Sequence, residues 1–103
     1  MAFMGLVDTK DVEAFAELLA ADLGRRFPPS SEKRTDASAS KQLANILESL
    51  GTQAARFRDE RQLGLYKKAK LGNAFRWRLK ELGYSTAFIE QATHAIVTRV
   101  AIK

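Results

Sequence analysis

The stretch LYKKAKLGNAFRWRLKELGYS, residues 65–85, carries the clearest evidence for the fold of this 103-residue chain. Its apolar residues recur every three or four positions, which is the period of an amphipathic helix. Gly83 suits the left-handed residue that follows a helix, and Ser85 suits the N-cap of the next one. The stretch therefore predicts a helix over 65–82, a tight corner, and a further helix over 86–101.

The same period runs through the rest of the sequence, and no long strand-like alternation interrupts it. A helix is predicted over 9–26, because the adjacent prolines Pro28 and Pro29 block helix at the residues before them. We therefore predict an all-α fold, a small bundle of about four helices with a helix-turn-helix-like corner at residues 82–86.

The remaining helix is expected to begin near 36–40, to continue through Gly51 and to end at about residue 62. Leu43, Leu50 and Phe57 keep a seven-residue spacing across that glycine, and a glycine inside a helix costs only about 1 kcal/mol. Such a helix would be about 35 Å long, more than a compact domain of this size comfortably covers. We therefore expect a homodimer with this helix in the interface.

Length and composition indicate one helical domain, residues 1–103, with a flexible linker at about 28–40 that is rich in serine and charge. The chain has no cysteine, which excludes disulfides and thiolate chemistry. It has no apolar run of membrane-spanning length and no recognisable signal peptide. We expect a cytoplasmic protein that does not act at a membrane.

Charge is unevenly distributed along the chain, whose net charge is +5. Residues 1–24 hold five acids and one lysine, for a net −4, and the rest holds 16 bases and seven acids, for a net +9. A basic balance favours a polyanionic partner. Alternatively, the acidic first helix pairs with the basic remainder, within the chain or across a dimer.

The sequence offers little that could perform catalysis. His94 is the only histidine, and its predicted place is on the outer face of its helix, where Glu90 is the only acid one turn away. No nucleophile elbow, phosphate-binding loop or histidine-based metal motif is present. We expect no catalytic residue, no metal site and no cofactor.

A DNA-reading helix-turn-helix would place the outer face of helix 86–101 in the major groove. That face consists of Ala87, Glu90, Gln91, His94 and Thr98. It holds one acid and no lysine or arginine, although phosphate binding needs cations beside the groups that read bases. The corner is therefore predicted to be a packing corner.

Helix 65–82 carries the cations instead. Its predicted buried arc is centred on Gly72 and includes Leu65, Ala69, Phe75, Leu79 and Leu82. Tyr66, Lys70, Asn73 and Trp77 follow one another at spacings of four, three and four, which places them in one stripe on the opposite face.

Two functions fit this outer face. Cationic and aromatic residues in alternation suit a nucleic-acid backbone, with Lys67, Lys70, Arg78 and Lys80 as the phosphate-binding residues. Alternatively, Tyr66, Asn73 and Trp77 contact a protein partner. Because large aromatic side chains are mostly buried, we favour packing of Tyr66 and Trp77, against the first helix or a second subunit, over ligand contact.

Three residues of this helix need a separate explanation. Lys68 and Arg76 fall within the predicted apolar arc, so at least one ion pair is expected there. The acids available for it are Asp11, Asp22, Glu48 and Asp59. Gly72 is expected to allow another helix to approach closely.

The sequence therefore predicts a non-enzymatic helical module whose activity is binding. The first hypothesis is a DNA-associated accessory or regulatory protein that contacts phosphates without base specificity. The alternative is a protein–protein interaction or assembly factor that binds no nucleic acid.

Overall fold

The computed structural model describes residues 8–101, which form four α-helices and one short 3₁₀ helix. The elements are α1 (Lys10–Arg26), the 3₁₀ helix η2 (Pro29–Lys33), α2 (Ala37–Arg61), α3 (Leu65–Leu82) and α4 (Thr86–Ala101). The described residues contain no strand. The predicted all-α bundle of four helices is confirmed, and each helix boundary agrees with its prediction to within one or two residues.

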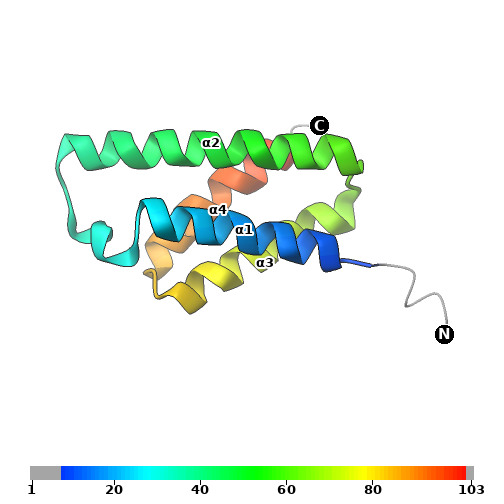
Figure 1. Ribbon diagram of the computed structural model, residues 1–103, viewed down its shortest axis with the longest axis horizontal. Helices are drawn as coiled ribbons and strands as arrows, with labels where there is room; N and C mark the ends of the chain where they lie inside the picture. The colour runs from blue at the N-terminus through cyan, green and yellow to red at the C-terminus, as the bar shows by residue number, and fades with distance from the viewer. Residues whose placement is uncertain (1–7, 102–103) are drawn as a thin grey trace.

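The helices form two layers (Figure 1). Helices α1 and α2 run side by side in opposite directions, and α3 and α4 cross behind them, with α1 packed on α3 and α2 packed on α4. The buried core lies between the layers and includes Leu19, Leu50, Phe75 and Ile96. Phe15 and Phe57 stack with ring centroids 4.1 Å apart and so join α1 to α2.

Helix α2 is a single helix through Gly51, as predicted. A side chain at Gly51 would collide with Arg99, because an added Cβ would lie 2.8 Å from Arg99 Cγ. At the start of α2, Asp36 accepts a hydrogen bond of 3.0 Å from the backbone N–H of Ala39. The side-chain hydrogen bond from Arg34 lowers the pKa of Asp36. The helix ends at Gln62, which adopts the left-handed conformation with φ = 50°.

The molecule is elongated, with extents of 52 × 26 × 19 Å, and α2, roughly 37 Å long, runs along its longest axis (Figure 1). The apolar stripe of α2, which includes Ile46, Leu50 and Ala54, is buried by the chain's own helices. Dimerisation itself stays a prediction.

The buried face of α3 differs from the predicted arc. Gly72, Phe75 and Leu79 are buried as predicted, and Leu71 is buried as well. Leu65 is 86% exposed and Leu82 is 45% exposed, because each is an end residue of the helix. Ala69 is exposed as well.

The close approach predicted at Gly72 is confirmed, since a Cβ there would lie 2.7 Å from Val97 Cγ2 of α4. Helix α4 therefore covers the side of α3 that carries Gly72.

The corner between α3 and α4 has the predicted geometry. Gly83 adopts φ = 99° after the last turn of α3, and the Ser85 hydroxyl accepts a hydrogen bond of 3.2 Å from the Phe88 N–H. Tyr84 is buried and donates its hydroxyl to the Phe27 carbonyl at 2.6 Å. Burial, with a smaller contribution from the charge of Glu32, raises the pKa of Tyr84 to about 12.

The segment predicted as a linker, residues 28–40, makes specific contacts. Its first half forms η2, and Glu32 within η2 accepts hydrogen bonds from both the backbone N–H and the hydroxyl of Ser85. Its second half enters α2, where Ala39 is buried. The segment thereby fastens the connection between α1 and α2 to the α3–α4 corner, and its flexibility stays a prediction.

Arg58 is a buried cation that sequence reasoning did not single out. It is only 9% exposed, and its guanidinium donates to the Arg99 carbonyl at 2.6 Å and to both carboxylate oxygens of Asp59. A carbonyl in the last turn of a helix has no partner within the helix. Arg58 therefore connects α2 to the end of α4.

Candidate interaction surface

The outer stripe of α3 is exposed at Tyr66, Asn73 and Trp77 and half-buried at Lys70. Tyr66 is 63% exposed and Trp77 is 59% exposed, and Lys70 and Asn73 lie between them. The opposite face of the helix carries the buried residues Leu71, Phe75 and Leu79, so the residues of the stripe point away from the core. We call Tyr66, Lys70, Asn73 and Trp77 the α3 stripe.

The expectation that the two aromatic residues pack against the first helix is wrong. Helix α1 covers the other side of α3 and leaves most of Trp77 and Tyr66 in contact with solvent. Packing against a second subunit remains untested.

The four cations predicted to bind phosphate have different surroundings. Lys70 Nζ lies 3.5 Å from a carboxylate oxygen of Glu13, and Arg78 lies 3.4 Å from Glu17 and 3.3 Å from Glu81. Lys80 Nζ stands 5.3 Å from the centre of the Trp77 ring, in a cation–π position. Lys67 forms no ion pair with any of residues 8–101.

The acids of α1 therefore lie among the cations of α3. Glu13 and Glu17 are four residues apart and share the face of α1 that borders α3. The sequence signal for this contact was the acidic first helix beside a basic remainder. Exposed pairs of this kind contribute about 0–1 kcal/mol each, so they set the local charge pattern more than the stability.

The ion pair predicted for Lys68 or Arg76 exists, but with a different acid. Arg76 donates two hydrogen bonds of 3.1 Å to the carboxylate of Glu90 in α4. The four acids proposed as partners lie elsewhere, because Arg76 lies on the side of α3 that faces α4. Arg76 is 45% exposed and Lys68 is half-buried, so neither is a buried cation.

Two depressions flank the α3 stripe, one on each side, and Lys70 and Asn73 line both. The depression on the α1 side is lined by Glu13, Lys70, Asn73, Ala74, Trp77, Arg78 and Glu81. The depression on the α4 side is lined by Tyr66, Ala69, Lys70, Gly72, Asn73, Arg76 and Val97. Sequence reasoning missed Val97, which is 37% exposed, because no periodic signal distinguishes it from the core positions of α4.

The outer face of α4 is exposed as predicted, from Ala87 to Thr98. His94 Nε2 lies 3.5 Å from the Thr98 hydroxyl, and Glu90 forms an ion pair with Arg76. The cation beside this face therefore comes from α3 and not from α4, and the packing role of the corner stays a prediction.

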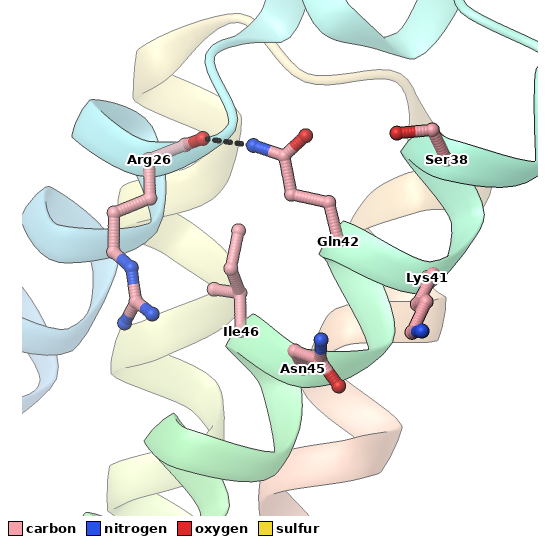
Figure 2. A pocket seen from close by; sticks show the side chains of 6 residues that line it. All are labelled: Arg26, Ser38, Lys41, Gln42, Asn45 and Ile46. Carbon is pink, nitrogen blue, oxygen red and sulfur yellow. Dashed lines mark hydrogen bonds between the residues drawn. The ribbon is translucent and has the colours of Figure 1, made fainter.

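A further open depression lies between the end of α1 and the start of α2 (Figure 2). It is lined by Arg26, Ser38, Lys41, Gln42, Asn45 and Ile46. Gln42 donates a hydrogen bond of 3.2 Å to the Arg26 carbonyl and so closes one wall. This contact stabilises the end of α1, whose last carbonyls have no partner within the helix.

Among residues 8–101 no helix is long and apolar enough to cross a membrane. The same residues contain no group of three or more acidic, histidine or cysteine side chains placed to hold a metal ion. Comparison of the chain with protein-family models, with curated proteins and with solved structures finds no significant match, so the surface itself must indicate the function.

Proposed function

We propose that the protein is a non-enzymatic helical module that acts by binding another protein chain through the α3 stripe. The proposal rests on the exposure of two large aromatic side chains, Tyr66 and Trp77, on one stripe of one helix. Tryptophan and tyrosine are the residues in which binding energy is concentrated at protein interfaces. Covering them would remove a large apolar area from water.

The charges around the stripe favour a protein partner over a polyanion. Lys70 and Arg78 each lie beside a glutamate of α1, and Arg78 lies beside Glu81 as well. These carboxylates would repel the phosphates of a nucleic acid bound to this surface, while the cations would attract them. A protein surface can match both signs, and such matching contributes specificity.

Nucleic-acid binding is the second candidate, and specific contacts favour it. Lys67 forms no ion pair within the described part of the chain, and Lys80 lies over the Trp77 ring, so a base that stacks on Trp77 would find a cation at its edge. Because exposed ion pairs are weak, phosphates can also compete for Lys70 and Arg78.

Fluorescence anisotropy separates the two candidates. A labelled single-stranded oligonucleotide and a labelled duplex are titrated with the protein at rising salt. If the protein binds another protein, we expect no saturable binding at physiological ionic strength. Saturable binding that weakens steeply with salt, and that is lost in the triple variant K67A/K70A/R78A, would establish the nucleic-acid function instead.

Affinity capture tests the protein partner directly. Immobilised wild type is compared with the Trp77→Ala variant, and with Arg56→Ala, which alters an exposed residue of α2, as the matched control. We expect a protein that is retained by the wild type and the control, lost with Trp77→Ala, and bound again after purification. Equal retention of every captured protein by Trp77→Ala would contradict the proposal.

A further inference from the structure

We infer that the α3 stripe binds a second copy of this chain, in an antiparallel α3–α3 pair related by a twofold axis. This inference rests on the proposed function, since it identifies the partner of the same surface. A twofold interface is self-complementary: if residue i of the first chain contacts residue j of the second, then residue j of the first chain contacts residue i of the second.

The order of residues along the stripe has this self-complementarity. An axis that passes midway between Leu71 and Gly72 exchanges position 66 with position 77 and position 70 with position 73. Tyr66 of each chain then faces Trp77 of the other, and Lys70 faces Asn73. Each contact occurs twice, so the pair has aromatic layers at both ends and Lys–Asn layers at its centre.

The spacing of the stripe also suits helix–helix packing. Intervals of four, three and four are those of the seam of a two-stranded coiled coil. Polar residues in such a seam fix the register at some expense of stability. In the Lys–Asn layers, the carbonyl oxygen of Asn73 can accept a hydrogen bond from the ammonium of Lys70.

The depressions beside the stripe lie where the antiparallel pair needs them. The axis brings the second chain's Trp77 to the level of Tyr66, beside the depression that Tyr66, Ala69 and Val97 line. It brings the second chain's Tyr66 to the level of Trp77, beside the depression on the α1 side. Each aromatic side chain of one chain therefore lies beside a depression in the surface of the other.

The charges are complementary in the same arrangement. Arg78 lies beside two carboxylates, those of Glu17 and Glu81, so this cluster has a net negative charge. Lys67 lies on the same side of α3, three turns earlier. The twofold axis brings it to within about two residues of the level of Arg78, so the unpaired ammonium of one chain approaches the acidic cluster of the other.

The area that the stripe provides predicts a reversible dimer. An aromatic side chain buries about 150–250 Å², and Tyr66 and Trp77 are 63% and 59% exposed. The four aromatic residues of a pair would therefore contribute roughly 350–600 Å². The lower limit for specific interfaces is roughly 1,200 Å², so the flanking residues would have to supply at least half of the buried area. The dimer fraction should rise with concentration rather than be complete.

Sedimentation measurements over a range of concentrations test the pairing. We expect a monomer–dimer equilibrium in the wild type and in Arg56→Ala, and a monomer throughout in Trp77→Ala. Trp77 is the only tryptophan, so its emission should shift to shorter wavelength as the dimer forms. A strict monomer at the highest concentration reached, or a dimer that persists in Trp77→Ala, would overturn the inference.

Cross-linking tests the register, and the absence of native cysteine makes each introduced thiol unique. The variants Lys67→Cys and Arg78→Cys, which keep both aromatic residues of the stripe, are treated with a short bifunctional thiol reagent, separately and mixed. The axis brings position 67 of one chain to within about two residues of the level of position 78 of the other, whereas identical positions lie at least about 13 Å apart along the helix axis. We expect cross-linked dimer from the mixture only. Equal cross-linking of the separate variants would exclude the antiparallel register.

The outcomes distinguish this inference from the proposed function. A monomeric wild type that nevertheless captures a different protein, with loss of capture in Trp77→Ala, refutes the homodimer and supports the binding module. A monomer that captures no protein through Trp77 and binds DNA in a salt-dependent manner refutes both.

Discussion

Replacing Gly72 by alanine should test the contact that brings α3 and α4 together. The new Cβ would lie 2.7 Å from Val97 Cγ2, whereas carbon atoms in contact prefer about 3.5–4.0 Å. The helices must separate by about 1 Å, or Val97 must leave its preferred rotamer, which is well defined for a β-branched residue in a helix. Overpacking of this kind costs about 1–3 kcal/mol.

Helix propensity acts in the opposite direction. Alanine is favoured over glycine in a helix by about 1 kcal/mol, so Gly72→Ala should lower the free energy of unfolding by up to about 2 kcal/mol. In a Val97→Ala background the collision is absent and only the propensity remains. The same substitution should then raise the free energy of unfolding by about 1 kcal/mol.

Urea denaturation of the four proteins in this cycle measures the effect. It should be done at one fixed protein concentration, because a dimer would make the midpoint depend on concentration. In thermal unfolding, 1 kcal/mol corresponds to about 4–8 °C for a domain of this size. If Gly72→Ala stabilises both backgrounds equally, the close approach of α4 at Gly72 is refuted.

Two further predictions concern the corner and its pH dependence. Because the pKa of Tyr84 is raised to about 12 from its usual value of 10.0, its contribution to stability is complete below pH 10 and is lost as the pH rises towards 12. The wild type should therefore lose more free energy of unfolding between pH 9 and pH 12 than Tyr84→Phe, by up to about 3 kcal/mol. Equal losses, measured by denaturant titration at each pH, would show that the hydroxyl titrates alike in both states. Replacing Ser85 by alanine removes the cap on the Phe88 N–H and should cost about 1 kcal/mol. It also removes the hydroxyl that donates to Glu32, so Ser85→Thr, which keeps the hydroxyl, is the control and should lose less stability in the same denaturation assay.

The helices were predictable because their signals are local. Period, proline, glycine and capping residues each act within one or two turns, so α1, the continuous α2 and the α3–α4 corner follow from the order of residues. Gly83 and Ser85 needed only a helix on either side to take their roles. The membership of the α3 stripe was likewise predictable, because residues four, three and four apart share a face whatever packs against it.

The sequence by itself determined which elements form and which residues share a stripe. Tertiary structure alone decided which stripe is covered, because coverage depends on how the layers cross. It left Leu65 exposed at the start of α3, buried Leu71, and brought Glu13 and Glu17 beside the cations of α3. It also left Trp77 uncovered, since α1 and α4 pack against the other side of α3. Burial is a property of contacts between elements distant in sequence, so no local pattern could have decided whether Trp77 belongs to the core or to an interface.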